Sequence, residues 1–236
     1  MARIREIFGG LIILTGATLM FAGDRVWTWA SGQATGNEAL RIAVVTGDTD
    51  AARRAIRAGA SVDGAYGYVP LLSAACVGDE RLVTFLIAHG AAVDAPGPQG
   101  MTALGFAACS GDVRTMRALL LAGANPNGGS DTTNIRSLPL VYALNMGHSA
   151  AAELLLKWGA DPNLCATCDN GASPLTAAAA AGSIGTEQIV RLLIAAGADV
   201  NQPDGQGLTP LGAATEAGDM GLAKILRQAG ADARRG

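Results

Sequence analysis

The chain has 236 residues, of which half are apolar but only 4% are aromatic, and 32 are glycine. This length allows one or two ordinary domains with a sizeable core. Alanine and leucine supply most of the apolar content, which is typical of small, closely packed helices joined by frequent turns. The formal net charge is −3, so no basic excess indicates a nucleic-acid-binding protein.

The first 30 residues differ in composition from the rest. Arg3 and Arg5 come first, and no charged residue then occurs over residues 7–23. A basic start followed by an apolar run is the pattern of a secretory signal peptide. The run is also just long enough to cross a bilayer as an uncleaved helix, which needs ~17–25 residues, and Trp27 and Trp29 follow where aromatic rings favour the interface. The sequence therefore predicts one hydrophobic N-terminal helix, either a signal peptide or a signal anchor.

Both alternatives place the remainder of the chain on the same side of the membrane. The N-terminal arginines stay in the cytoplasm, so the body is expected to be exported to the periplasm or to the periplasmic face of the inner membrane. A buried helix of a soluble domain is a third alternative, although the run shows no amphipathic pattern. We divide the chain into residues 1–30, a flexible SGQATGN linker at 31–37, and a body over 38–236.

A fixed spacing between two kinds of glycine recurs six times in the body. The first glycine of each pair is followed by Asp, His or Ser, and the second is followed by Ala. The intervals are 12, 12, 12, 12, 15 and 12 residues. The pairs are Gly47 and Gly59, Gly78 and Gly90, Gly111 and Gly123, Gly147 and Gly159, Gly182 and Gly197, and Gly218 and Gly230. Periodicity of this kind indicates a repeat protein of six units.

Each unit predicts two helices separated by the first glycine. The earlier helix is entered through a Pro-Leu or similar step, as in VPLLSAACVGD and TPLGAATEAGD. Proline is tolerated in the first turn because its missing N–H would be unpaired there, and the glycine allows a left-handed cap. The later helix has apolar residues at helical spacing, such as Met116, Leu119 and Leu120. The sequence predicts six helix pairs, almost no strand, and repeat boundaries near residues 64, 97, 134, 168 and 204.

These motifs resemble the ankyrin repeat. The TPL step at 209–211, the Ala-Ala pair ahead of Gly-Asp, and GADVN at 197–201 match that family's signature, and the resemblance covers residues 38–236. It implies an all-α solenoid of stacked helix-turn-helix units, stabilised by contacts between neighbouring repeats. The first helices and the projecting turns would form a concave face. The resemblance also implies a protein that binds other proteins and needs no cofactor.

The sequence departs from the family pattern in two places. The family has a histidine after Pro-Leu that ties neighbouring turns together by hydrogen bonds, so its loss predicts a less rigid array. The residues that replace it are Leu72, Gly105, Val141, Thr176 and Gly212. The turn over residues 127–138 is lengthened and has Arg136 where glycine is usual. Repeat one lacks the Pro-Leu step, as terminal repeats often do.

Residues that could carry catalysis fit the repeat better than they fit an active site. His89 and His148 are the only histidines, and both fall at helix ends. No third ligand or nucleophile accompanies either of them, so neither a catalytic triad nor a zinc enzyme is indicated. The glycine-rich stretch at 128–134 lacks the lysine of a phosphate-binding loop. We predict no catalytic residue, no metal site and no small-molecule substrate.

The four cysteines fall into two groups. Cys165 and Cys168 form a CATC motif in the turn between repeats four and five. In an oxidising compartment they are expected to form a local disulfide; free thiols without a role, or a redox or metal function, are the alternatives. Cys76 and Cys109 occupy equivalent positions one repeat apart. Packed helices lie about 8–10 Å apart, whereas a disulfide needs Cα atoms within about 7 Å, so we expect these two thiols to stay unbridged.

The family pattern also locates a candidate partner-binding surface. The two residues after each Ala-Ala pair would face the concave groove, and Glu216 is the only charge among them. The candidates on the helices are Cys76, Val77, Cys109, Ser110, Asn145, Met146, Ala180 and Ala181. The candidates on the turns are Tyr66, Tyr68, Gln99, Met101, Asn134, Ile135, Asp169 and Asn170. Tyrosine and methionine are common in interfaces, although small residues at these positions could also serve close helix packing alone.

The sequence therefore indicates a non-catalytic scaffold that inhibits or supports an exported partner protein. One alternative is an accessory subunit of a membrane complex, held through residues 7–23 if they are uncleaved. The other is a thiol-redox or metal-handling protein that uses Cys165 and Cys168. Neither a nucleic acid nor a small molecule is expected as a partner.

Overall fold

The computed structural model describes residues 11–12, 20–21, 36–64, 67–97, 100–129, 138–164, 173–181 and 186–232. The chain divides into two compact units, residues 1–33 and 34–236. In the first unit, strands β1 (Leu11–Ile12) and β2 (Met20–Phe21) pair antiparallel, with Leu11 opposite Phe21. The second unit contains every described helix.

The sequence predicts a single helix through residues 7–23, and the structure differs at the four described positions of that run. Ile12 and Phe21 are residue types that favour strands, and the run has no amphipathic face that would hold a helix against a core. The other residues of the run lie outside the described part. No helix among the described residues is long and apolar enough to span a membrane.

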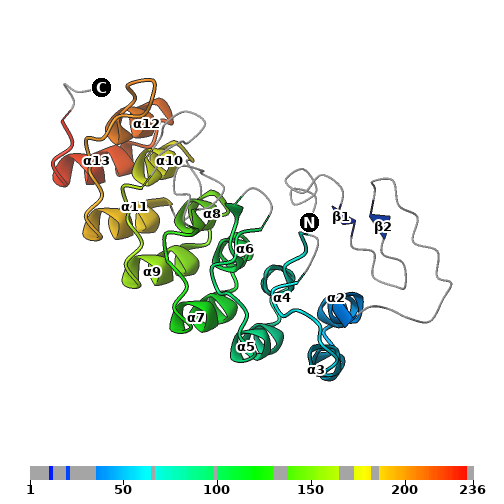
Figure 1. Cartoon of the computed structure of the whole chain (residues 1–236). Coiled ribbons are helices and arrows are strands. Elements are labelled where there is room, and N and C mark those ends of the chain that lie inside the picture. The colour runs from blue at the N-terminus through cyan, green and yellow to red at the C-terminus, as the bar shows by residue number, and fades with distance from the viewer. Residues whose placement is uncertain are drawn as a thin grey trace. The chain divides into compact units, whose positions relative to one another are not determined.

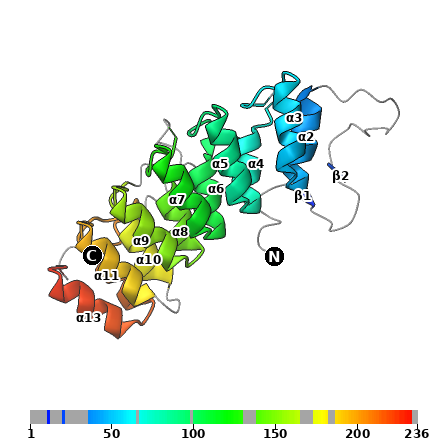
Figure 2. The same ribbon diagram turned by 90° about the horizontal axis from the view of Figure 1, so that it is seen from below.

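The second unit consists of six helix pairs stacked side by side (Figures 1 and 2). The first helices of the pairs form one row, here called the inner row: α2 (Gly36–Thr46), α4 (Pro70–Val77), α6 (Ala103–Ser110), α8 (Pro139–Asn145), α10 (Pro174–Ala181) and α12 (Pro210–Glu216). The second helices form the outer row: α3 (Thr49–Arg57), α5 (Glu80–Ala88), α7 (Val113–Leu121), α9 (Ser149–Lys157), α11 (Thr186–Ala195) and α13 (Met220–Gln228). Each helix contacts its partner in the pair and the next helix of its own row.

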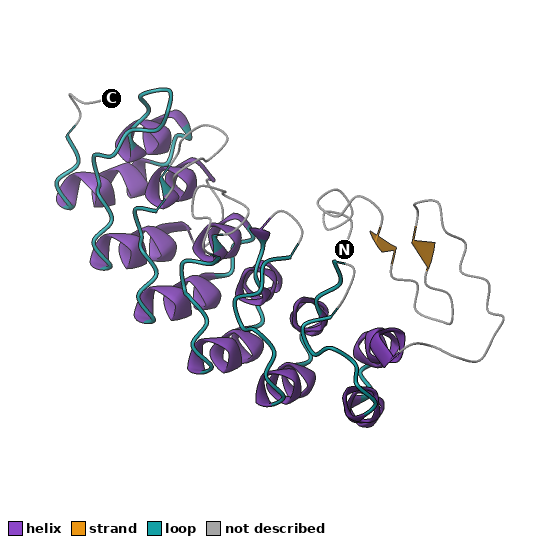
Figure 3. Cartoon of the chain, viewed as in Figure 1, coloured by secondary structure: helices purple, strands orange, loops and turns teal. Residues whose placement is uncertain are grey.

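Local chemistry sets where these helices begin and end. Proline occupies the first turn of α4, α8 and α12, as the missing N–H allows. Gly78 ends α4 in the left-handed conformation, with φ 76°. Most outer helices begin at an aspartate cap; Asp79, for example, accepts a hydrogen bond from the N–H of Leu82 at 3.0 Å. Within the described part of this unit the helices are joined only by turns and loops (Figure 3), so the predicted all-α solenoid of six helix pairs is confirmed.

One continuous apolar core runs through all six repeats. The Ala-Ala pairs of the inner helices, such as Ala74 and Ala75, are completely buried, and so are the leucines of the outer helices, such as Leu82 and Leu86. Alanine has no bulk beyond Cβ, so neighbouring helices pack closely and leucine fills the space between the rows. Every described core residue lies within residues 40–226, so the second unit carries its own core.

A ladder of hydrogen bonds joins the turns that link an outer helix to the next inner helix, here called the finger turns. In each, a backbone N–H donates to an Asn or Asp side chain one repeat earlier, and the residue two positions on supplies the next acceptor. The bonds are Ser61 N to Asn37 (2.8 Å), Ala92 N to Asp63 (2.7 Å), Asn125 N to Asp94 (3.1 Å), Asp161 N to Asn127 (2.8 Å), Asp199 N to Asn163 (2.8 Å) and Asp232 N to Asn201 (2.8 Å). Neighbouring turns are therefore tied together without the family histidine.

Candidate protein-binding surface

The inner row combines exposed side chains with an absence of charge. Helices α4, α6, α8 and α10 contain no charged residue. The residues after each buried Ala-Ala pair turn toward solvent, because each step along a helix rotates the side chain by about 100°. Val77 is 60% exposed, and Cys76, Ser110, Asn145 and Ala180 are also exposed. Cys109 and Met146 are half-buried beside them.

Charge appears only at the two ends of the described inner row. At one end, on α2, Arg41 Nε donates to Glu38 Oε2 at 2.9 Å, and this hydrogen bond holds the pKa of Glu38 below its ordinary value. At the other end, on α12, Glu216 is exposed. Ile42 and Val45 on α2 extend the apolar exposed surface past Val77 into repeat one. The exposed apolar side chains of this surface are therefore concentrated in the first two repeats, and its one exposed acid outside the Glu38–Arg41 pair lies in the last.

A family model for three copies of the ankyrin repeat matches residues 93–166 and 143–235, and a single-repeat model matches residues 66–98. The chain belongs to the ankyrin-repeat family. Members of this family generally act by binding other proteins, not by catalysis. No curated protein matches the chain.

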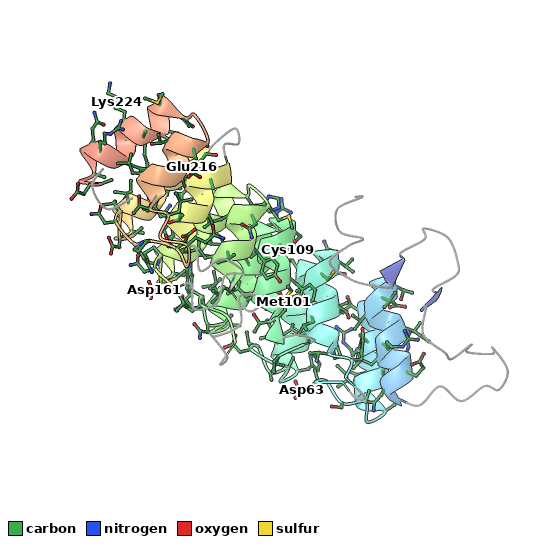
Figure 4. The ribbon with its side chains drawn as sticks, turned by 90° about the horizontal axis from the view of Figure 1, so that it is seen from above. Asp63, Met101, Cys109, Asp161, Glu216 and Lys224 are labelled. Atoms are coloured by element: carbon green, nitrogen blue, oxygen red, sulfur yellow. The ribbon has the colours of Figure 1, made fainter. Side chains whose placement is uncertain are left out.

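The arrangement of the ankyrin repeats is visible in Figure 4. Asp63 and Asp161 lie along the edge formed by the finger turns, and Cys109 and Glu216 lie along the opposite edge, with Met101 between them. The inner helices run between these two edges, so a partner lying along the inner row would meet carboxylates along the finger turns and, at the opposite edge, Cys109 in the middle of the row and a carboxylate, Glu216, at its end.

The prediction that Met101 contacts a partner is wrong, because its side chain is only 4% exposed. Gly105 stands where the family has histidine, and Met101 fills the space left there: a Cβ built on Gly105 would lie 3.0 Å from Met101 Cγ. Leu208 covers Gly212 in the same way, since the corresponding distance to Leu208 Cδ1 is 2.8 Å. A large side chain four residues earlier thus replaces the missing histidine.

Tyr68 exposes less surface to a partner than its position in the sequence predicts. It is half-buried, and its buried hydroxyl forms no hydrogen bond of good geometry with a described residue, although the Ser73 side chain interacts with it. Burial raises the pKa of the phenol, an effect that the nearby Ser73 and Arg41 side chains offset only in part. Nine further candidates lie outside the described residues or, for Ala181, have an undescribed side chain: Tyr66, Gln99, Asn134, Ile135, Cys165, Cys168, Asp169, Asn170 and Ala181. Their predicted roles stay predictions.

Two aromatic residues of the inner row were missing from the sequence-based set. Phe106 and Tyr142 are half-buried and lie three residues before Cys109 and Asn145, respectively. Residues three apart share one face of a helix, so this spacing alone could have identified them. They give the middle of the inner row aromatic surface that the two residues after each Ala-Ala pair do not provide.

Cys76 and Cys109 lie on successive contacting helices and are both free thiols. Partial desolvation by the surrounding protein raises the pKa of each thiol, although Cys76 is exposed by surface area, and proximity to Cys76 raises the pKa of Cys109 further. Both thiols are therefore protonated and poorly nucleophilic at neutral pH. Among the described residues, no group of three or more His, Cys, Asp or Glu side chains is placed to hold a metal ion.

Both histidines occupy helix ends, as predicted. His89 follows α5; its ring lies 4.1 Å from the Phe85 ring, and its Nδ1 lies 2.8 Å from the Phe85 carbonyl oxygen. His148 precedes α9, at the position where the other capped outer helices have aspartate. Its Nε2 lies 3.2 Å from the carbonyl oxygen of Cys109 in the preceding repeat. Each histidine thus has a structural contact at a repeat position.

Proposed function

We propose that this ankyrin-repeat protein is a scaffold that binds a partner protein along its inner row. The observation that most directly supports this proposal is that four successive inner helices, α4, α6, α8 and α10, expose side chains but contain no charged residue. Protein surfaces that only need solvation carry charged residues, and the cores of interfaces are depleted of them. A surface of this kind is better suited to being covered than to facing water.

Exposed apolar area supports the same proposal. Val77, Ile42 and Val45 are large apolar side chains exposed along the first two inner helices. Covering apolar surface contributes roughly 25 cal/mol per Å², and contiguous exposed apolar patches often mark interaction sites. A partner segment with apolar side chains at its centre would match these repeats, and a basic residue near Glu216 would match the charge at the other end.

A charge-insertion experiment tests the surface. Asn145→Glu together with Ala180→Glu places two carboxylates on exposed inner-row positions, where burying them against a partner would cost several kcal/mol. Arg117→Glu, on an exposed position of the outer row, is the control. Tagged wild-type protein and both variants are used to capture proteins from native membranes and periplasm, and the captured proteins are identified by mass spectrometry.

The expected result is a specific protein that co-purifies with the wild type and with Arg117→Glu but not with the inner-row double variant. The fold should be unchanged in all three, since the substituted side chains face solvent, and far-UV circular dichroism checks this. A partner that is lost with Arg117→Glu and retained by the inner-row variant would move the binding site to the outer row.

We also propose that the repeats are exported, and that residues 1–30 act as a signal peptide or as an anchor. The support is the N-terminal sequence itself, with Arg3 and Arg5 ahead of an uncharged run over 7–23. A reporter enzyme active only outside the cytoplasm, fused after Gly236, should be active. The intact mass of the membrane-extracted protein then separates a cleaved signal peptide from an anchor that holds the scaffold to a membrane complex.

A further inference from the structure

The outer row carries three large apolar side chains in solvent. Leu121 at the end of α7 is 70% exposed, Trp158 directly after α9 is 41% exposed, and Met220 at the start of α13 is 64% exposed. Helices α7 and α9 are neighbours in contact, so Leu121 and Trp158 end two adjacent helices of the same face.

The fold does not require these side chains. At the position of Trp158, four other repeats have alanine: Ala58, Ala122, Ala196 and Ala229. At the position of Leu121, the other repeats have Arg57, Ala88, Lys157, Ala195 and Gln228. Small or polar residues therefore close the same turn elsewhere in the array, and repeats three and four expose apolar surface that packing does not explain.

Unpaired arginines accompany this apolar surface. Arg114, Arg117 and Leu121 are exposed and spaced by three and four residues, so they form one stripe along α7. Arg81 of α5 and Arg114 line one open depression, which Val77, Gly78, Asp79, Glu80 and Asp112 complete. None of these arginines forms an ion pair among the described residues, whereas Lys157 and Arg191 each pair with a glutamate four residues earlier, at 2.6 and 2.8 Å.

The acidic residues near this stripe are mostly engaged. Asp79 and Asp112 cap α5 and α7 and accept backbone N–H donors, and Asp112 Oδ2 also accepts from Thr115 Oγ1 at 2.6 Å. Glu80 is exposed at the start of α5. The last outer helix repeats the combination, because Met220, Lys224 and Arg227 are all exposed and neither cation forms an ion pair with a described residue.

We infer that the outer row is a docking surface for an anionic phospholipid bilayer. The outer patch, defined as Arg81, Arg114, Arg117, Leu121 and Trp158, would bind lipid phosphates through the arginines while the apolar side chains enter the interface. Guanidinium groups suit phosphate because they are weakly hydrated and donate in a planar fork. Indole rings favour the headgroup region, and each cation near an anionic surface adds attraction.

The combination favours a bilayer over a nucleic acid. Leu121 and Met220 have nothing to contact on a phosphodiester backbone, but they gain by entering an interface of lipid chains. Apart from the depression that Arg81 and Arg114 share with Val77, the outer row is the face that the proposed partner would leave free, so membrane docking and partner binding are compatible.

The second unit, residues 34–236, is suited to a direct test because it contains the whole described core. Trp27 and Trp29 lie outside it, so Trp158 is its only tryptophan. The fluorescence of this unit therefore reports on the outer patch. Vesicles of phosphatidylcholine mixed with phosphatidylglycerol should shift the Trp158 emission to shorter wavelength and co-sediment with the protein. Vesicles of phosphatidylcholine alone should do neither, and added salt should weaken the binding.

Two variants with the same change in net charge separate the patch from the charge of the whole protein. Arg114→Gln with Arg117→Gln lowers the net charge by two on the outer row, and Asn145→Glu with Ala180→Glu lowers it by two on the inner row. The outer-row variant should partition into the anionic vesicles roughly 25-fold more weakly, from about fivefold per cation. The inner-row variant should bind the vesicles like the wild type, although it loses the partner protein. Far-UV circular dichroism confirms that both are folded.

Equal weakening in both variants would show that net charge alone drives binding and would overturn the inference. An unshifted Trp158 emission on anionic vesicles, or equal binding to phosphatidylcholine alone, would do the same. Displacement of the protein from anionic vesicles by a short DNA duplex that also shifts Trp158 would assign the patch to nucleic acid instead. None of these results tests partner binding to the inner row, so either proposal can be rejected without rejecting the other.

Discussion

Leu72 occupies the space that a side chain at Gly97 would need: a Cβ built on Gly97 would lie 2.0 Å from Leu72 Cδ2. The two residues belong to successive repeats, since Leu72 lies on α4 and Gly97 lies in the next finger turn. Leu72 stands where the family has histidine. The larger, branched side chain is therefore accommodated by a glycine in the next repeat, whereas Gly105 and Gly212 are covered by Met101 and Leu208.

Gly97→Ala should lower the free energy of unfolding by about 1–3 kcal/mol, the usual cost of forcing extra atoms into a packed site. Urea unfolding followed by circular dichroism measures this. Gly221→Ala on α13 is the matched control, because the Asp219 carboxylate at 3.3 Å is the only group near a Cβ built there; alanine should add about 0.5–1 kcal/mol there through helix propensity. In a Leu72→Ala background the cost of Gly97→Ala should shrink. A stable Gly97→Ala protein would show that this contact is not restrictive.

Exchanging the residues at two equivalent helix starts should shift stability in opposite directions. Asp112 caps α7 by accepting from the N–H groups of Arg114 and Thr115 at 3.1 and 3.3 Å, whereas His148 gives α9 no side-chain cap. His148→Asp should raise the free energy of unfolding by about 1 kcal/mol, and Asp112→His should lower it by a similar amount. Thermal unfolding of both variants is the measurement. A destabilised His148→Asp protein would mean that the contact with the Cys109 carbonyl outweighs a cap.

Tyr68→Phe should leave the protein as stable as the wild type, or more stable, at neutral pH, because the buried hydroxyl forms no hydrogen bond of good geometry with a described residue. Burial raises the pKa of this phenol in the folded state. Ionisation of this phenol therefore destabilises the fold, an effect that is absent below about pH 10, where the unfolded phenol titrates. The loss of stability grows as the pH rises from there toward the native pKa. Urea midpoints across this range should fall more steeply for the wild type than for Tyr68→Phe; parallel curves would contradict the assignment.

Exported protein should contain one local disulfide, between Cys165 and Cys168, and two free thiols. Alkylation of denatured, unreduced protein followed by peptide mass spectrometry should modify only Cys76 and Cys109, and prior reduction should make all four cysteines reactive. In the native protein Cys76 and Cys109 should react slowly, because partial desolvation raises the pKa of both thiols. Four modified cysteines without reduction would show that the CATC motif is not oxidised.

The features that the sequence alone determined are local in the chain. The spacing between paired glycines, the Pro-Leu steps and the aspartates at helix starts each act within about one turn of a helix, and together they predict six helix pairs and their boundaries. The side chains that follow the buried pair of each inner helix are solvent-facing, as predicted, at Val77, Asn145 and Ala180, because helical rotation from a buried pair decides their direction.

The tertiary structure decided what depends on contacts between repeats. Met101 is buried because Gly105 leaves it room, and Gly97 is needed because Leu72 of the preceding repeat fills its side. The same holds for charge: Arg117 and Arg191 occupy the same repeat position, yet only Arg191 has a glutamate within reach. Periodicity assigns each residue to a face of a helix, but the size and charge of neighbours from other turns and other repeats determine whether that face is filled, paired or left open to a partner.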